Sequence, residues 1–345
     1  MLMTIIKVKN CLFLFLALLL LQSCNNASNT YNENAGNELS KYKYELVKDW
    51  PQLSPGFLLS PVSGVGVDNQ QNIFIFQRTG RAWTVPFPDS LISSNTIFLF
   101  DRITGKILNS WGSNLFIMPH GLTVDKEDNV WVTDVGLQQV FKFDHEGSLL
   151  LKLGVAKIPG NDSLHFNLPT DVAVADDGSF YVSDGYGNSR VVKFSKEGKY
   201  LFAWGKKGNK QGEFNIPHMI DLDSYGNVYV ADRENNRIQE FDANGIFLKE
   251  WKNSEATQLY AVAINKKNNR LFAIDLFKVN DTVDKGSDII QFDSMMKVVA
   301  RTGRTGSNTE PVLRFHDFAI DDEENIYTCE TGNKRIRKFK KVSIK

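Results

Sequence analysis

The amino-acid sequence predicts an all-β fold: a six-bladed β-propeller that follows an N-terminal signal and lipoprotein segment. A unit of four short strand patterns recurs six times along the chain, and its spacing of roughly 40 to 50 residues is typical of propeller blades. The chain has 24 Phe, 10 Tyr and 6 Trp against 10 Pro, a balance that favours strands over disorder. A β-sandwich is the rival fold, but it would not repeat a four-strand unit six times.

Residues 1–23 have the pattern of a secretory signal peptide. Lys7 and Lys9 precede an apolar run over residues 11–21, which is short for a membrane span. The run ends in Leu-Gln-Ser followed by Cys24, which resembles a bacterial lipobox, the motif whose cysteine is lipidated. An ordinary signal peptide or an uncleaved anchor are the alternatives.

These features predict a lipoprotein of the bacterial cell envelope. We expect it to be secreted across the inner membrane, to face the periplasm or the cell surface, and to touch the membrane only through lipid on Cys24. The polar residues 24–42 would form a flexible tether to a propeller over residues 43–345.

Charge and cysteine content restrict the partners and the stabilising bonds. Lys plus Arg and Asp plus Glu each total 40, so a net charge of zero provides no field that attracts nucleic acid. Without the signal segment and Cys24, only Cys329 remains, which leaves no cysteine pair for an intrachain disulfide. We expect a monomer whose core supplies its stability.

Each repeat predicts four strands from the centre of the ring outward. Second strands end in Asp, as at residues 130–134 and 228–232, and third strands recur at 139–143 and 237–241. Turns such as Asp-Gly and Asn-Gly separate them. The Asn-x-Arg-Ile-x-x-Phe pattern of residues 235–241 is similar to the NHL class of blade. Residues 43–50 form a candidate strand that closes the ring with the last blade.

One position of the innermost strand holds histidine in every second blade. In blade order, this position holds Ser63, His120, Thr170, His218, Tyr260 and His316. A threefold rotation relates alternate blades of a six-bladed ring, so the three imidazoles should converge at the channel mouth. Three neutral imidazoles suit Zn²⁺ and leave a fourth position for water or substrate. Iron or another divalent ion is an alternative, as is a set of hydrogen-bonded channel residues.

The two other histidines are weaker candidates for metal ligands. His145 lies in a turn, where we expect it to be solvated, and His165 lies in a loop or at the substrate cleft.

A second position follows the second strand, at the same face of the ring. It holds Arg78 in blade one and Arg233 in blade four, and Tyr186 lies one residue further along in blade three. Two guanidinium groups beside a metal indicate an anionic substrate, because Arg binds carboxylates in bidentate fashion. Salt bridges to the many aspartates, and packing of the tyrosine over a turn, are the structural alternatives.

Several long motifs in the sequence resemble those of a known protein family. Met118-Pro-His-Gly-Leu-Thr-Val-Asp125, Val182-Ser-Asp-Gly-Tyr-Gly-Asn-Ser-Arg190 and Val230-Ala-Asp-Arg-Glu-Asn-Asn-Arg-Ile-Gln239 closely resemble the peptidylamidoglycolate lyase domain of the peptide-amidating enzymes. The resemblance runs from about Val62 to Phe339. It implies a six-bladed propeller that converts a peptide ending in α-hydroxyglycine into the peptide amide and glyoxylate. The substrate here could also be a small amidoglycolate.

The resemblance also implies roles for the catalytic candidates. Three residues correspond to its zinc ligands: His120, His218 and His316. Tyr186 corresponds to the tyrosine proposed as general base, and Arg78 and Arg233 to arginines near the substrate.

The same resemblance implies a structural calcium ion. Asp317 corresponds to its acidic ligand, and the backbone carbonyls of Val65 and Leu122 would contribute. Two departures stand out. Animal members carry cysteine pairs where this chain has Asn167 with Gly187 and Tyr229 with Glu240, and Arg314 with Phe315 replaces a favoured Met-Pro before the last histidine.

Two other functions compete with the lyase. One is a non-catalytic NHL propeller that binds a protein or glycan and needs no metal. The other is a calcium-dependent lactonase-like propeller, which relies on carboxylates and Asn rather than on three histidines.

Overall fold

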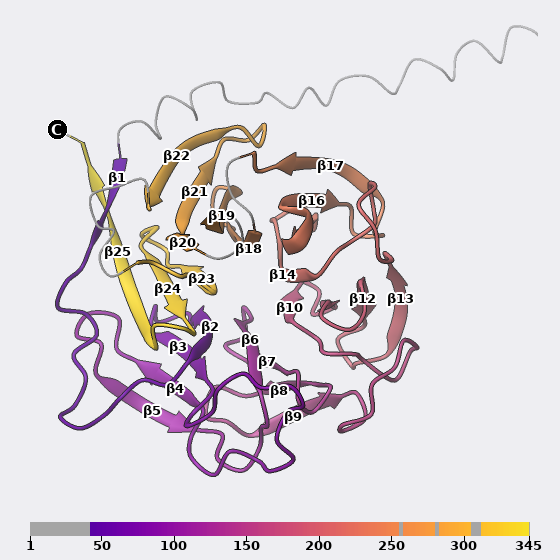
Figure 1. Ribbon diagram of the computed structural model, residues 1–345, viewed down its shortest axis with the longest axis horizontal. Coiled ribbons are helices and arrows are strands. Elements are labelled where there is room, and N and C mark those ends of the chain that lie inside the picture. Colours follow the sequence, from indigo (N-terminus) through magenta and orange to yellow (C-terminus); the bar gives the residue numbers. More distant parts are fainter. Residues whose placement is uncertain (1–41, 255–257, 280–282, 305–311, 345) are drawn as a thin grey trace, which may run out of the picture. The chain divides into compact units, whose positions relative to one another are not determined.

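The computed structural model describes residues 42–254, 258–279, 283–304 and 312–344 (Figure 1). The predicted signal segment, Cys24 and the tether up to residue 41 lie outside the described residues. Within the described ranges, no helix is both long enough and apolar enough to cross a membrane.

Six antiparallel sheets surround a common centre, as predicted (Figure 1). The strands of blades one to three, from the centre outward, are β2 (Val62–Val67), β3 (Ile73–Gln77), β4 (Ile97–Phe100), β5 (Ile107–Trp111); β6 (Pro119–Val124), β7 (Val130–Asp134), β8 (Gln139–Phe143), β9 (Leu149–Leu153); and β10 (Asp171–Val174), β11 (Phe180–Asp184), β12 (Arg190–Phe194), β13 (Tyr200–Trp204).

The other three blades follow the same order, with additions in blades four and five. Their elements are β14 (Pro217–Leu222), β15 (Val228–Asp232), the 3₁₀ turn η1 (Arg233–Asn235), β16 (Arg237–Phe241), β17 (Phe247–Lys252); β18 (Gln258–Asn265), β19 (Arg270–Val279), β20 (Val283–Gly286), β21 (Asp288–Phe292), β22 (Val298–Gly303); and β23 (Asp317–Ile320), β24 (Ile326–Glu330), β25 (Arg335–Ser343), β1 (Tyr42–Leu46).

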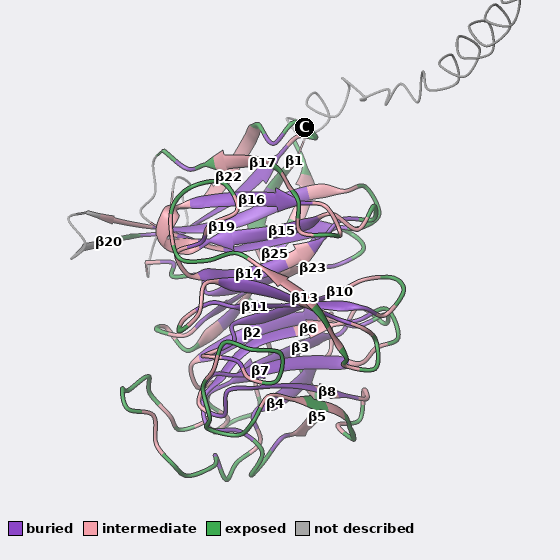
Figure 2. Cartoon of the chain, turned by 90° about the vertical axis from the view of Figure 1, so that its right-hand side faces the viewer, coloured by how far each residue is buried: buried purple, intermediate pink, exposed green. Residues whose placement is uncertain are grey.

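Burial explains why the sequence of each blade changes from the centre outward. All five residues of the second strands β3, β7, β11 and β15 are buried, because neighbouring blades cover both faces of the sheet. The outermost strand β9 has only exposed and half-buried residues. The core therefore lies between adjacent blades, as Figure 2 shows.

The ring is closed by the first described strand, as predicted. Strand β1 pairs antiparallel with β25, from Tyr42 opposite Ser343 to Leu46 opposite Phe339. Because this strand supplies the outer edge of the last blade, the two ends of the propeller domain hold each other in place.

The NHL-type pattern is a hydrogen-bonded corner of the blade. In blade four, Asp232 at the end of the second strand is fully buried, and its Oδ2 accepts hydrogen bonds from Arg237 Nε at 2.7 Å and Asn235 Nδ2 at 2.7 Å. Asp184 and Arg190 repeat the pair in blade three at 2.9 Å. The Asp, Asn and Arg of the repeat thus fix the loop that leaves the mouth face.

The two residue pairs that stand where the resemblance implies cysteine pairs are each made of neighbours in this structure. Tyr229 lies directly opposite Glu240 in the β15–β16 pairing. Gly187 donates its backbone N–H to the carbonyl of Asn167 at 3.0 Å. Both pairs are therefore adjacent without a covalent link.

Candidate active site

The three histidines predicted from alternate blades meet at the mouth of the channel. Their ring centroids are 4.9 Å apart for His120 and His218, 4.9 Å for His120 and His316, and 5.1 Å for His218 and His316. Within the described part of the chain, they form the one group of three or more His, Cys, Asp or Glu side chains close enough to share a metal, with ligand atoms within 4.8 Å of one another.

Each imidazole is oriented by a backbone carbonyl of the next blade. The Nδ1 atom of His120 lies 2.7 Å from the Thr170 oxygen, that of His218 lies 2.8 Å from the Tyr260 oxygen, and that of His316 lies 2.8 Å from the Ser63 oxygen. A carbonyl only accepts, so Nδ1 must carry the proton. The lone pair of the other ring nitrogen, Nε2, is then available for a metal, which is the usual arrangement around ligating histidines.

Burial keeps these rings neutral. It lowers the pKa of His316 to about 3, and the positive charge of Arg78 adds to the shift. The pKa values of His120 and His218 are also lowered, first by burial and then by nearby histidine and arginine charges. Neutral imidazole is the form that binds metal, so the site is prepared for a cation without first losing protons.

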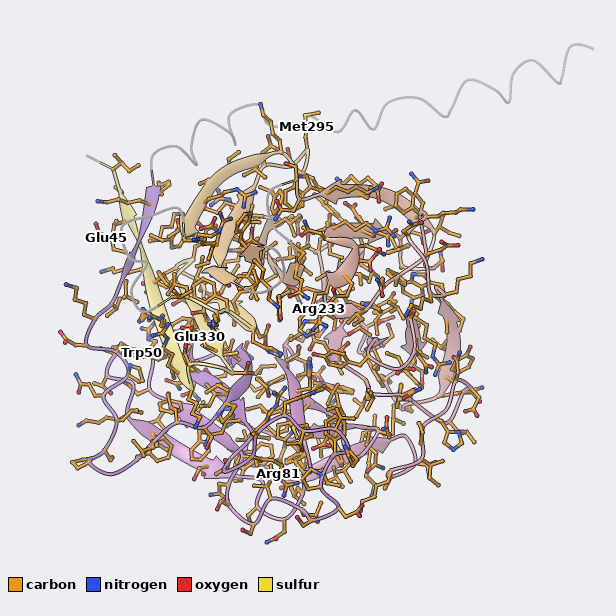
Figure 3. The ribbon with its side chains drawn as sticks, viewed as in Figure 1. Glu45, Trp50, Arg81, Arg233, Met295 and Glu330 are labelled. Atoms are coloured by element: carbon orange, nitrogen blue, oxygen red, sulfur yellow. The ribbon has the colours of Figure 1, made fainter. Side chains whose placement is uncertain are left out.

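Tyr186 joins the histidine cluster through its hydroxyl. Its oxygen lies 3.0 Å from Nε2 of His120 and 3.0 Å from Nε2 of His218. Arg233 Nη1 donates to the same oxygen at 3.2 Å. Figure 3 places Arg233 close to the centre of the ring. The phenol is thus positioned between the ligand atoms and a fixed positive charge.

The two predicted arginines are anchored differently. Arg78 is buried, donates from Nε to the Pro119 carbonyl at 2.9 Å, and lies with its guanidinium carbon 4.8 Å from the centre of the Trp83 ring. Burial lowers the pKa of Arg78, while the nearby Tyr186 opposes the shift.

Arg233 has both an acidic and an aromatic environment. Its Nε donates to Glu234 at 2.9 Å, and its guanidinium carbon lies 5.2 Å and 5.3 Å from the ring centres of Tyr186 and Tyr260. Burial by itself would lower the pKa of Arg233, but these neighbours together outweigh it and raise the pKa. Arg233 therefore forms a salt bridge, which was the structural alternative, but to Glu234. Its Nη1 atom also contacts the hydroxyl of Tyr186, so the salt bridge does not account for the whole guanidinium group.

A cavity of about 300 Å³ opens over this cluster. Arg78, Tyr186, Arg233 and His316 line it, as the sequence positions predict. The sequence did not identify the remaining lining residues as functional: Trp83, Tyr260, Leu276, Lys278, Arg314, Phe315, Thr331 and Gly332. The sequence did single out two of these positions. Tyr260 occupies the repeat position that holds histidine in alternate blades, and Arg314 replaces the methionine that the resembled family favours.

The opposite end of the channel holds carboxylates instead of imidazoles. Asp317, Val65 and Leu122, the predicted calcium ligands, line a second cavity of about 300 Å³ together with Asp171 and Asp221. Asp317 is buried, and its Oδ2 accepts a hydrogen bond from the Val65 N–H at 3.1 Å. Burial, the largest cause, raises the pKa of Asp317 to about 7, and the charge of Asp221 adds to it.

The two remaining histidines lie outside the cavity lining. His145 is not solvated as predicted: its Nε2 lies 3.0 Å from Asp68, and its ring packs edge-on against Phe74, because the turn reaches across to blade one. His165 lies in a loop, as expected, with its Nδ1 2.9 Å from Asp162. It does not line the mouth cavity.

Fold and site together define an NHL-repeat propeller of the enzymatic kind. A model of the NHL repeat matches residues 116–143, 166–194 and 214–241. The chain is 33% identical over 299 residues to the probable peptidyl-alpha-hydroxyglycine alpha-amidating lyase of Caenorhabditis elegans, a match that covers 82% of this chain and 83% of the relative. The chain therefore belongs to the peptidyl-alpha-hydroxyglycine alpha-amidating lyase family and is a lyase-like enzyme.

Other similarities are partial or concern the fold alone. Peptidyl-glycine alpha-amidating monooxygenase B of Xenopus laevis is 42% identical over 234 residues, which are 62% of this chain but only 26% of that relative. A catalytically inactive virginiamycin B lyase from Staphylococcus aureus, solved with quinupristin, aligns with a TM-score of 0.55 at 16% identity, over 86% of this chain and 85% of that one.

Proposed function

We propose that this protein is a zinc-dependent lyase that cleaves the C–N bond of peptidyl-α-hydroxyglycine, or of a small amidoglycolate, to give an amide and glyoxylate. The family supports a lyase that takes part in peptide amidation. The observation that carries the zinc assignment is the set of three Nδ1–carbonyl hydrogen bonds, which leaves three Nε2 lone pairs at one point.

The histidines fit zinc by number and by chemistry. His120, His218 and His316 would hold the ion, and three neutral nitrogen ligands with an open fourth position are typical of catalytic zinc. When bound there, zinc would lower the pKa of the substrate hydroxyl.

The protein side chains complete the reaction. Tyr186 accepts the hydroxyl proton, because Arg233 at 3.2 Å stabilises the phenolate form that acts as base. The electron pair of the O–H bond becomes the second bond of the glyoxylate C=O. The C–N bond breaks, its electrons stay on the amide nitrogen, and that nitrogen receives the proton that Tyr186 took. Arg78 holds the substrate carboxylate, so the reacting carbon stays beside the phenol.

Calcium is the second metal of the proposal and is structural. Asp317, with the carbonyls of Val65 and Leu122, would bind it at the far end of the channel, where oxygen ligands suit a hard cation. The buried carboxylates of Asp171 and Asp317 repel each other, and the pKa of Asp171 is raised by burial first and by Asp317 second. A divalent cation would remove this repulsion.

We also propose that the propeller, over residues 43–345, is a monomer held at the bacterial cell envelope by lipid on Cys24. The full chain should then enter the detergent phase on Triton X-114 partition, and a Cys24→Ser variant should stay in the aqueous phase. Equal partition of both forms would refute the anchor.

The lyase assignment is tested by release of glyoxylate from α-hydroxyhippurate. We expect turnover by the purified protein, loss of turnover with a zinc chelator, and recovery when zinc is added back. His165→Ala is the matched control, since it removes a histidine outside the cluster and should keep full activity. Turnover that persists after complete removal of metal would refute the zinc requirement.

A further inference from the structure

One connection at the mouth face is much longer than its equivalents. Residues 78–96 join the second and third strands of blade one. The same strands of blades two, three, four and six are joined by residues 135–138, 185–189, 233–236 and 331–334. Long connections in a compact domain usually serve a function. This one brings Trp83 into the lining of the mouth cavity.

The long connection is fixed to the segment that leads into β6 of blade two. Arg81 donates from Nη1 to the carbonyl of Ile117 at 3.1 Å. The backbone N–H of Ile92 donates to the carbonyl of Phe116 at 2.8 Å. Because these hydrogen bonds hold both halves of the connection, Trp83 has a defined position at the cavity.

Trp83 contacts both groups that would hold the α-hydroxyglycine unit. The centre of its ring is 4.8 Å from the guanidinium carbon of Arg78 and 5.4 Å from the ring centre of Tyr186. Phe87 supports the indole in an edge-on contact, with ring centres 5.0 Å apart. Tyr186 belongs to blade three, so this side chain from blade one reaches across the mouth of the channel.

The exposure of the lining residues increases from the reacting end outward. Arg78 is only 4% exposed, whereas Trp83 is 40% exposed. Trp83 is also the most exposed of the described aromatic residues that line the cavity, since Tyr186 and Tyr260 are half-buried and Phe315 is buried. A large ring that is held in place and still exposed offers apolar surface that a ligand can cover.

The direction of the substrate follows from the proposed function, on which this inference rests. With the substrate carboxylate at Arg78 and its hydroxyl at Tyr186, the reacting carbon lies beside Trp83, which contacts both. The buried His316 closes the inner end of the cavity, so the acyl group must extend outward past the indole. A volume of about 300 Å³ holds the α-hydroxyglycine unit and a group of about one residue.

We propose that Trp83 is a specificity-determining residue whose indole binds the acyl group next to the scissile bond. The preferred substrate class is an N-acyl-α-hydroxyglycine whose acyl part carries an aromatic or other bulky apolar group. Because the contact is apolar, the discrimination should change little with salt. An indole that only supported Arg78 would instead affect all acyl groups equally.

The test compares glyoxylate release from the phenylacetyl and acetyl conjugates of α-hydroxyglycine. Both have a saturated carbon next to the carbonyl group, so the two leaving amides are chemically similar. We expect kcat/KM to be about 10-fold higher for the phenylacetyl conjugate, with or without 0.5 M NaCl. In Trp83→Ala this ratio should fall toward 1, and in Trp83→Phe part of it should return.

Two controls separate the possible failures. Tyr225→Ala removes an aromatic side chain that is 80% exposed in the β14–β15 turn, outside the cavity lining, and should keep the 10-fold ratio. Calorimetry with N-phenylacetylglycine and N-acetylglycine, which lack the reacting hydroxyl, needs no turnover. In Trp83→Ala the Kd of the first ligand alone should rise, by about 10-fold.

Three results would overturn this inference alone: equal kcat/KM for the two conjugates, a ratio that survives in Trp83→Ala, or a loss of the same size for both conjugates in that variant. The last result would mean that the indole only supports Arg78 and Tyr186. No glyoxylate from either conjugate would overturn the proposed function and this inference with it.

Discussion

The two ends of the central channel are built from the same inner strands but offer opposite chemistry. At the mouth, three imidazoles point their Nε2 atoms at one place, and burial lowers their pKa values. At the far end, Asp171, Asp221 and Asp317 line a cavity, and burial raises their pKa values. Both shifts favour the uncharged form, because burial is their largest cause at each end.

The geometry of the two ends differs as well. The histidines occupy one repeat position in alternate blades, so the symmetry of the ring brings them together. Asp171 and Asp317 follow that position by one residue, whereas Asp221 follows it by three. The carboxylates therefore line one cavity at different depths, and a cation there must take most of its ligands from carbonyls and water. Nitrogen ligands at one end and oxygen ligands at the other predict two different metals.

The sharpest way to break this comparison is to remove one imidazole. His218→Ala should reduce bound zinc from one ion per chain to none and lower the rate of glyoxylate release at least about 1000-fold, about 4 kcal/mol of activation free energy. Metal analysis and single-substrate kinetics measure both. A variant that keeps its zinc, or keeps its rate without zinc, would contradict a shared metal on three histidines.

Tyr186→Phe separates the base from the metal at the mouth. The variant should keep one zinc ion per chain but lose about 100- to 1000-fold in kcat, because only the proton acceptor is removed. If the zinc were lost along with the activity, the phenol would be acting as a ligand or support for the metal rather than as the base.

Asp317→Asn tests the far end alone. Zinc content should not change. Calcium should raise the melting temperature of the unmodified protein by about 5 °C, which is the size expected from ligand-linked stabilisation at saturating ion, and should leave the variant unaffected. Thermal unfolding with calcium and with a calcium chelator measures the difference. A calcium response that survives in Asp317→Asn would place the ion elsewhere.

Side chains within the repeat could be predicted from the sequence, and those outside it could not. The ring, its closing strand and the positions of His120 and Arg233 follow from a repeat whose blades are related by rotation. Trp83 lies in a connection between strands, and Lys278 lies on an extension of one strand, so no repeat position indicates where these two residues lie. The prediction that His145 is solvated was wrong for the same reason. This residue lies in a turn of blade two, and the repeat does not indicate that its ring contacts the carboxylate of Asp68 in blade one.

Substitution of His145 should have the smallest effect of the changes considered. The pKa of this histidine is shifted in the opposite direction to those of the three histidines at the mouth. Burial alone would lower the pKa of His145, but hydrogen bonds to Asp68 and Glu146 outweigh it, and the pKa is raised. Its stabilising contribution is therefore complete below the unfolded value of about 6.5 and is lost as the pH rises through the higher folded value. His145→Gln should cost about 0.5 to 1 kcal/mol of unfolding free energy at pH 5.5 and less at pH 8.5, as measured by denaturant titration. An equal cost at both pH values would mean that ring packing against Phe74, rather than the ion pair with Asp68, joins these two blades, since packing does not depend on the charge of the ring.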